Sequence, residues 1–343
     1  MSVAQAVAAG LICAIAGGCH IAGEPAAPEQ AGLGEIPITE RTGLREQAFA
    51  VLVELAAHPE PLIRANACEA LSAWPARLRP VATALIDDEN EGVRSVAYVA
   101  IGRAGLADLA RASGERDESP FVRASAAFAR AANGLPTTRS ALIAGLLSDP
   151  SPRVRSHSAL LLGLLGERSA AGPLREALQV MPARVADQES GLFRLQVAEA
   201  LVRLGEDDQL QVLRAALYPS RPEDLEGTAL AATSMGEVGD RGSIDELIYL
   251  TERRDESSVP LPAEIRLAAA GSLAKLDVPG SAEFAAAFLD DPDPRIQALA
   301  CVVVGDAGRA GWAGALEQGL SDLSPQVRVA AAAGVARLLA GEQ

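Results

Sequence analysis

The stretch LSDPSPRVRSHSALLLGLLGE, residues 147–167, contains the pattern from which the fold is predicted. An aspartate and two prolines open the stretch, Val, Ala and Leu residues follow at three- and four-residue spacing, and Gly166 stands near its end. Aspartate and proline are typical of a helix start, whereas glycine often ends a helix in the left-handed conformation. The spacing of the apolar residues is that of one helix face. We therefore predict one amphipathic helix with a defined start and end.

The same pattern recurs along the chain. With Arg155 as the reference position, the equivalent residues are Arg64, Arg94, Arg123, Arg155, Arg194, Thr228, Arg266, Gln297 and Arg328. Six residues earlier, five copies carry an aspartate: Asp88, Asp117, Asp149, Asp291 and Asp322. Eleven residues later, six copies carry a glycine: Gly105, Gly134, Gly166, Gly205, Gly239 and Gly308. We expect the aspartates to cap each helix and the glycines to end it.

A second amphipathic segment precedes each copy, for example TTRSALIAGLLS at residues 137–148, so each copy is predicted to be a helical hairpin. One hairpin cannot bury both of its apolar faces without neighbours on either side. Small residues four and eight positions after the reference, such as Ala159 and Gly163, would let neighbouring helices approach closely. Hydrophobic residues make up 49% of the chain but aromatics only 3%, which favours closely packed helices. We predict an all-α solenoid of about nine stacked hairpins over residues 44–343.

The turns DPSPRVR and DPDPRIQ and the helical segments ALLLGLLG and CVVVGDAG resemble the HEAT-repeat family, across residues 44–340. The resemblance is to the short HEAT-like repeats that also occur in phycobilisome lyases. It implies that each aspartate and the arginine six residues later form a ladder between adjacent copies. Thr228 and Gln297 depart from the pattern, so we expect the ladder to be interrupted at the sixth and eighth copies.

Asp149, His157 and Ser158 are residue types used in nucleophilic catalysis, and they lie close together in the opening stretch. A catalytic triad needs its base oriented toward the nucleophile, whereas side chains within one helical turn point away from one another. Asp149 and Arg155 also recur at fixed offsets, as structural residues of a repeat do. His157 lies away from the apolar stripe, so we predict that it is a solvated surface residue. No catalytic residue is predicted.

Other chemical functions find little support in the sequence. The HEAT-like deoxyhypusine hydroxylases carry His-Glu pairs as iron ligands, and this chain has no His-Glu dipeptide. The net charge of −15 disfavours nucleic acid, because a negative surface repels phosphate. Three histidines and four cysteines show no metal-ligand spacing. Cys68 and Cys301 both lie four residues after a reference position and are predicted to be small buried residues. We predict no cofactor and no metal site.

The N-terminal residues are typical of an export signal. Residues 2–19 carry no charged side chain, and the run ends in IAGGC, which resembles the lipidation motif of bacterial lipoproteins. Residues 20–43 are rich in Pro, Gly and Glu, which favours a flexible tether. We predict a signal peptide at 1–19, a lipid anchor on Cys19 and localisation at the bacterial cell envelope. The alternative is an ordinary apolar helix at the N-terminus of a cytoplasmic protein.

Two surfaces are candidates for partner binding. The intervals of 39, 34 and 38 residues between reference positions come from enlarged connections at 179–190, 218–227 and 253–264. Equivalent connections of stacked repeats lie along one edge, where binding residues are common. The connections supply Arg184, Arg221, Arg253 and Arg254; variation in loop length without functional consequence is the alternative.

The second surface is formed by successive second helices. We expect half-exposed apolar side chains there, Phe128, Leu160 and Val302, beside the cations Arg103, Arg203 and Lys275, with His157 nearby. The sequence as a whole predicts a non-catalytic scaffold that binds a protein or peptide. The alternatives are a lyase-type enzyme with Glu199, Arg203 and His157 on this surface, and a cytosolic assembly factor.

Overall fold

The computed structural model describes residues 38–137, 140–180, 187–254 and 258–340. Within these ranges the secondary structure consists of helices and one isolated backbone bridge, between Arg254 and Pro260. No helix in the described ranges is long and apolar enough to cross a membrane. The all-α prediction is confirmed.

Each copy contains a second helix, which we call the B helix. The B helices are α3 (Pro61–Ala70), α5 (Glu91–Ala104), α6 (Pro120–Ala132), α8 (Pro152–Leu165), α10 (Asp187–Arg203), α12 (Leu225–Val238), α14 (Ala263–Lys275), α16 (Pro294–Asp306) and α18 (Pro325–Leu338). Every predicted reference position lies in one of them, as the fourth residue except in the longer α10. The register of the repeat is therefore confirmed.

The first helix of each copy, the A helix, is shorter and more variable. The A helices are α2 (Ile38–Leu55), α4 (Pro75–Leu85), α7 (Ser140–Ser148), α9 (Ala171–Gln179), α11 (Leu210–Ala215), α13 (Ile244–Glu252), α15 (Ser281–Ala286) and α17 (Ala313–Glu317). In the third copy the short 3₁₀ turns η2 (Ala107–Leu109) and η3 (Gly114–Arg116) replace it. Because α2 begins at Ile38, residues 38–43 are helical, and the tether predicted for 20–43 is wrong there. Residues 1–37, with Cys19, lie outside the described residues.

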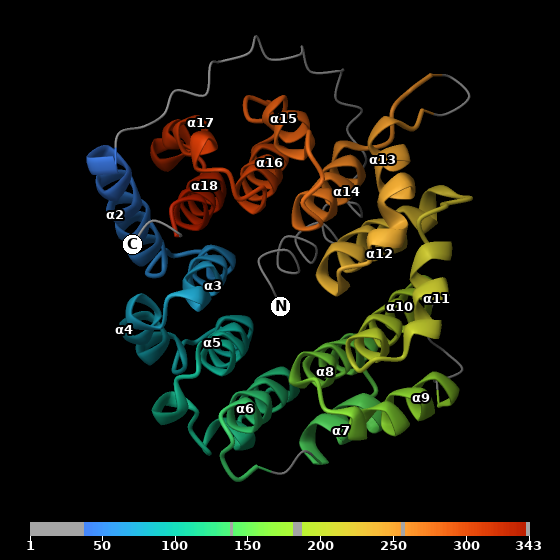
Figure 1. Cartoon of the computed structure of the whole chain (residues 1–343). Coiled ribbons are helices and arrows are strands. Elements are labelled where there is room, and N and C mark those ends of the chain that lie inside the picture. Colours follow the sequence, from blue (N-terminus) through green and yellow to red (C-terminus); the bar gives the residue numbers. More distant parts are fainter. Residues whose placement is uncertain (1–37, 138–139, 181–186, 255–257, 341–343) are drawn as a thin grey trace. The chain divides into compact units, whose positions relative to one another are not determined.

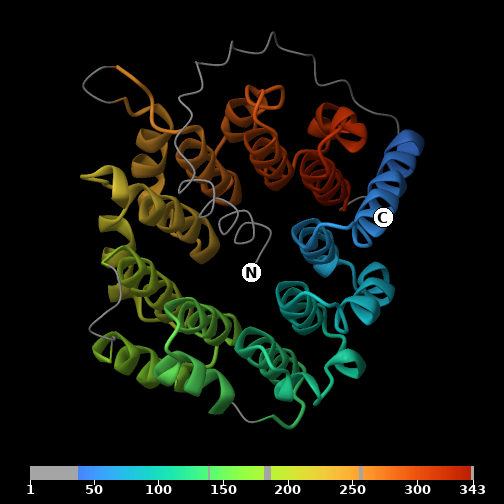
Figure 2. The ribbon, with the colours of Figure 1, turned by 180° about the vertical axis from the view of Figure 1, so that it is seen from behind.

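The described residues fall into two compact units. Unit 1 is Pro59–Gly227, and unit 2 combines 38–58 with 228–340. In unit 1 the helices α3, α5, α6, α8 and α10 pack on one another in chain order as one layer, with the A helices on one side of it (Figure 1). In unit 2 the B helices α14, α16 and α18 are stacked in the same way, as the view from behind also shows (Figure 2). The N-terminal α2 packs on α18, so in the sequence the residues of unit 1 separate α2 from the rest of unit 2.

The glycines at the ends of the B helices behave as predicted, whereas the aspartates at the starts do not. All six predicted glycines have a positive φ between 66° and 89°, which confirms that they end the B helices in the left-handed conformation. The aspartates do not cap the helices. Each accepts a hydrogen bond at Oδ1 from the backbone N–H two residues later, at 2.7–2.9 Å. The N-cap is that later residue, for example Ser151 before α8. The aspartates therefore close the turn that leads into the helix.

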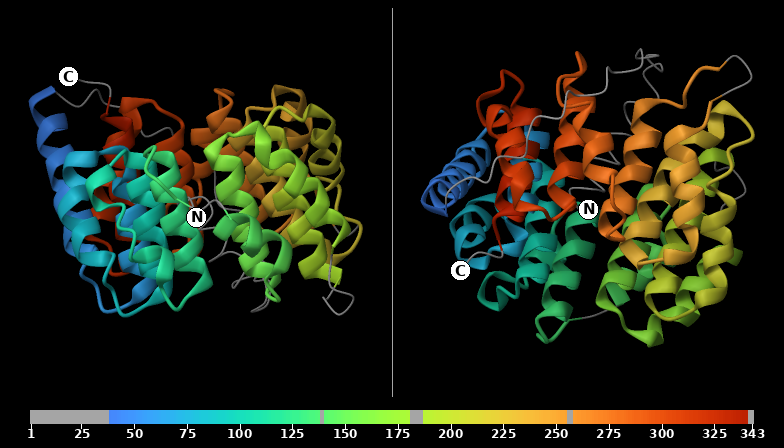
Figure 3. Two further views of the ribbon diagram at one scale, coloured as in Figure 1. Left: turned by 90° about the horizontal axis from the view of Figure 1, so that it is seen from below. Right: turned by 45° about the horizontal axis from the view of Figure 1, so that its top comes forward.

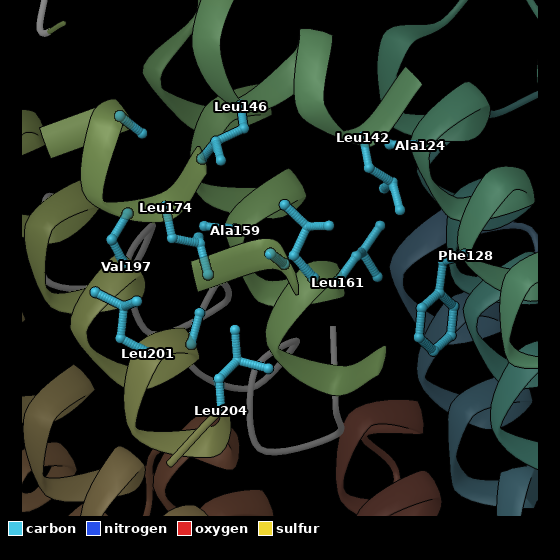
Figure 4. Packing of buried hydrophobic residues seen from close by; sticks show 14 of the residues in the cluster. Ala124, Phe128, Leu142, Leu146, Ala159, Leu161, Leu174, Val197, Leu201 and Leu204 are labelled. Carbon is cyan, nitrogen blue, oxygen red and sulfur yellow. The ribbon is translucent and has the colours of Figure 1, made fainter. Parts of the chain in front are cut away.

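The core of unit 1 runs between its two layers. Leu142 and Leu146 of α7 and Leu174 of α9 meet B-helix side chains such as Leu161 of α8 and Val197 of α10, and all five are fully buried (Figure 4). These side chains come from the A and B helices of two successive copies, α7 with α8 and α9 with α10. The core is therefore continuous along the unit, as stacked repeats require.

Neighbouring B helices approach closely at small residues, as predicted. A Cβ atom added at Gly163 would lie 2.8 Å from the Cα of Ala200 in α10, and one at Gly305 would lie 2.5 Å from the Cα of Gly334 in α18. Because both neighbours are backbone atoms, neither can move aside without shifting a helix.

Replacing Gly305 by alanine is therefore expected to destabilise unit 2 by about 1–2 kcal/mol, because overpacking outweighs the better helix propensity of alanine. Urea unfolding followed by circular dichroism measures this loss. Gly271→Ala is the matched control, since Gly271 also lies within a B helix of unit 2 but has no atom closer than 3.4 Å to its added Cβ. We expect that control to be neutral or slightly stabilising; equal stability of the Gly305→Ala chain would contradict the close approach.

Candidate partner-binding residues

The reference side chain of the repeat satisfies backbone carbonyls of its own copy. Arg64 donates to Pro59 O at 2.8 Å, and Arg94 donates to Asp88 O at 2.9 Å. Arg123, Arg266 and Arg328 also donate to carbonyls of the preceding helix or connection, as does the amide of Gln297. Carbonyls at the end of a helix have no partner within that helix. In these six copies the recurring side chain therefore fastens the preceding helix or connection to the B helix.

Among the described residues, the expected aspartate–arginine ladder is found at the start of unit 1. Arg64 holds Asp88 of the next copy through two hydrogen bonds of 2.8 Å, and Arg94 holds Asp117 through two of 2.9 Å. Burial raises the pKa of both carboxyls, but the guanidinium groups and backbone N–H donors lower it further, so each pKa lies below its usual value. Arg123 and Arg155 bind carbonyls instead. The ladder therefore ends at the third copy, earlier than the interruption predicted at Thr228 and Gln297.

Arg155 is the most deeply buried of these side chains. It is 1% exposed and donates to Leu146 O at 2.8 Å, Val180 O at 3.1 Å and Ala177 O at 3.3 Å. Leu146 lies in the last turn of α7, and Ala177 and Val180 lie at the end of α9, so one guanidinium holds the ends of two A helices. The charge also lies 4.9 Å from the ring centre of Phe193. Arg155 is a structural residue, as its recurrence indicated.

The prediction that His157 is a solvated surface residue is wrong. His157 is 8% exposed, and its Nε2 lies 2.8 Å from Ser125 Oγ, which lies 2.8 Å from Ser95 Oγ. The three side chains form a buried polar row across α8, α6 and α5. Burial lowers the pKa of His157 to about 3, so the ring is neutral at pH 7. His157 is therefore removed from the candidate partner-binding residues.

The second predicted surface is also less open than expected. Phe128, Leu160 and Val302 are buried rather than half-exposed. The cations beside them are paired: Arg203 with Glu199 at 2.9 Å and Arg103 with Glu69 at 3.6 Å.

In unit 2 the same helix position carries charges of alternating sign. Lys275 lies between Glu237 and Asp306, and Asp306 pairs with Arg337 at 2.6 Å. The row runs along α12, α14, α16 and α18. Each of these charges has a partner of opposite sign on a neighbouring helix, so the row stabilises the stacking of the B helices as a network.

The two described cysteines are small buried residues, as predicted. Cys68 and Cys301 are both buried, and burial raises the pKa of each thiol to about 12. In the described ranges, no three His, Cys, Asp or Glu side chains are grouped so that they could hold a metal ion.

The enlarged connections place their arginines at the surface. Arg221 is exposed and pairs with Asp224 at 2.9 Å, within unit 1. In unit 2, exposed Arg254 donates to Ser258 O at 2.9 Å, and the guanidinium carbon of Arg253 lies 5.9 Å from the ring centre of Tyr249. Arg184, the remaining predicted residue, lies outside the described residues.

Sequence reasoning missed the aromatic residues at these connections. The chain has three tyrosines. Tyr98 is buried, but Tyr218 and Tyr249 are each 52% exposed. Tyr218 lies three residues before Arg221, and Tyr249, with its exposed neighbour Ile248, lies just before Arg253. The signal was present in the sequence, because both tyrosines border enlarged connections in a chain that is poor in aromatics.

Comparison with known proteins gives one family match. Residues 109–191 match the family described as HEAT repeats. No curated protein matches the chain. Among solved structures, an engineered protein is 16% identical and covers 59% of this chain and 97% of its own, with a TM-score of 0.36. Human deoxyhypusine hydroxylase in complex with glycerol is 16% identical and covers 88% and 99%, with a TM-score of 0.36.

A third similar structure is Kap121p bound to Nup53p, which is 15% identical over 98% of this chain, with a TM-score of 0.34. This chain spans 44% of that protein's length. TM-scores of this size do not establish a shared fold, so the similarity to HEAT repeats rests on the match at residues 109–191. The chain is an all-α solenoid that carries HEAT repeats in residues 109–191.

Proposed function

We propose that the chain is a non-catalytic repeat scaffold that binds a protein partner through two exposed surface clusters. The first, in unit 1, consists of Tyr218 and Arg221. The second, in unit 2, consists of Ile248, Tyr249, Arg253 and Arg254. The observation that carries the proposal is that two of the three tyrosines are 52% exposed, each beside an arginine of an enlarged connection.

The chemistry of the two clusters supports a protein partner. Tyrosine and arginine are the residue types that most often dominate the energy of protein interfaces, because both combine a large apolar surface with hydrogen-bond donors. One arginine of each cluster is held in place. Arg221 pairs with Asp224, and the guanidinium of Arg253 lies against the ring of Tyr249. A net charge of −15 further favours a partner of positive net charge, which long-range attraction would bring to the surface.

Site-specific photo-crosslinking tests this proposal in the native cell. A photoreactive phenylalanine analogue placed at position 218 or 249 of the full chain should give a discrete protein adduct at each position. The controls are the same analogue at Leu62 in unit 1, which is 46% exposed, and at fully exposed Leu323 in unit 2. We expect no adduct at the controls. No adduct at 218 and 249, or equal adducts at all four positions, would exclude the two clusters as the binding residues.

Substitution of both tyrosines should then weaken capture of the crosslinked protein. The Tyr218→Ala, Tyr249→Ala double variant is expected to bind at least roughly tenfold more weakly, because replacing an interface tyrosine by alanine usually causes a large loss of affinity. Leu62→Ala with Leu323→Ala is the matched control and should leave capture unchanged.

We further propose that the chain is attached to a bacterial envelope membrane through a lipid on Cys19. The support is the uncharged run that ends in IAGGC. Mass spectrometry of the N-terminal peptide from native protein tests this directly. A diacylated Cys19 as the first residue is expected, and a peptide that retains Met1 would contradict it.

A further inference from the structure

The first described helix lies against the last one. In unit 2, α2 packs on α18 (Figure 1 and Figure 3). Arg45 of α2 donates to Leu339 O at the C-terminal end of α18, at 3.2 Å, and Glu54 of α2 pairs with Arg328 in the first turn of α18, at 3.0 Å. The two helices are therefore antiparallel, with one polar contact near each end.

Between these polar contacts, α2 presents an apolar stripe. Leu44, Ala48, Leu52 and Leu55 are all buried, at the three- and four-residue spacing of one helix face. Apart from Arg328 and Arg337, the residues of α18 from Val327 to Leu338 are apolar and buried. Its surfaces are divided between α16, α17 and α2. The part under α2 is thus a surface shaped for an amphipathic helix.

α2 occupies the place that a following copy would take. In unit 1, Arg64 and Arg94 each reach an acidic side chain of the next copy. Arg328 holds the equivalent position in the last copy, and the acid that it reaches is Glu54 of α2. The end of the array therefore meets a helix through an arginine–carboxylate contact of the kind that joins the first three copies.

Several features indicate that α2 is held less firmly than a repeat helix. Glu54 is 63% exposed, and exposed ion pairs contribute little to stability. The first turns of α2 contain Thr42 and Gly43, which have low helix propensity, and Glu40, Thr42 and Gly43 are exposed. A segment with few buried side chains at its start opens more readily than a core helix.

We propose that the surface of α18 beneath α2 is a helix-binding surface, and that α2 covers it as an internal ligand that a partner helix displaces. The partner is an amphipathic helix with the α2 pattern: apolar residues spaced as 44, 48, 52 and 55, a basic residue near its start and an acidic residue near its end. This inference rests on the proposed scaffold function and names the kind of partner that the C-terminal end of the array accepts.

A peptide of residues 38–57 tests the surface in the full chain. In the Leu52→Asp chain a charge replaces the fully buried centre of the stripe, so α2 should leave α18. The fluorescent peptide is then expected to bind this chain at least tenfold more tightly than it binds the native chain, whose own α2 blocks the surface. A peptide carrying Leu52→Asp should bind neither chain. Failure of the native peptide to bind a folded Leu52→Asp chain, or equal binding to both chains, overturns the proposal.

The exposed contact provides a second, milder variant that does not depend on a buried change. In the Glu54→Arg chain, α2 repels Arg328 and should yield to the native peptide at severalfold lower concentration than in the native chain. A peptide carrying Glu54→Arg should lose this advantage. If the two peptides displace α2 equally well, the proposal is overturned. Crosslinking at Tyr218 and Tyr249 probes residues outside α2 and α18, so the failure of one experiment does not decide the other.

Discussion

Replacing Arg155 by methionine is expected to lower the free energy of unfolding by about 3 kcal/mol, because three buried backbone carbonyls lose a charged donor at once. Two of these carbonyls belong to the end of α9 and one to the last turn of α7, so the loss loosens both A helices. Methionine fills part of the volume but donates no hydrogen bond. Urea unfolding of the full chain, followed by circular dichroism, measures the change.

Arg194→Met is the matched control for this experiment. Arg194 is the equivalent residue of the next copy, but it is exposed, so its replacement should change stability by less than about 0.5 kcal/mol. Arg155→Lys should fall between the two, since lysine keeps the charge but cannot spread donors over three carbonyls as a guanidinium does. Equal effects of Arg155→Met and Arg194→Met would show that the buried hydrogen bonds do not stabilise the unit.

Acid is expected to destabilise the native chain relative to His157→Gln. The pKa of His157 is about 3 in the folded chain, and an unfolded histidine titrates near 6.5, so only the unfolded chain binds the proton between these values. The stability that His157 provides is therefore complete above pH 6.5 and is lost as the pH falls toward 3. From pH 7 to pH 5, the difference in unfolding free energy between the native and His157→Gln chains should shift by about 2 kcal/mol in favour of the variant.

Comparison with a variant cancels the titration of the carboxylates, which both chains share. Denaturant titrations at pH 5, 6 and 7 provide the measurement. Parallel pH curves for the native and His157→Gln chains would mean that the row of Ser95, Ser125 and His157 admits water and a proton in the folded state.

The repeat was predictable because its signals are local. A positive φ at Gly166 and a turn closed by Asp149 depend on a few neighbouring residues, and the same residue types recur wherever the chain needs them. The fold class and the boundaries of the B helices follow from this recurrence. The exact role of Asp149 did not, because an aspartate that closes a turn and one that caps a helix differ by only two positions in the sequence.

Burial of His157 could not be predicted from one helix. The periodicity of α8 identifies the face toward α7, but a B helix in a stack also has a neighbour on each side. Those lateral neighbours, α6 and α10, bury positions that appear polar and open in the sequence. For the candidate partner-binding residues, exposure of the charged side chains Arg221 and Arg254 was predictable from the long connections. Exposure of Tyr218 and Tyr249 was not, because an aromatic residue is equally suited to a core.

The packing of α2 on α18 has a consequence for the synthesis of the protein. Arg45 and its acceptor Leu339 are 294 residues apart, so α2 leaves the ribosome long before its docking surface exists. At about 5–20 residues per second, the interval lasts on the order of tens of seconds. Throughout that time the stripe around Leu52 has no α18 to cover it, and unit 1 is translated in between. Nascent α2 is therefore expected to need protection by a chaperone during translation.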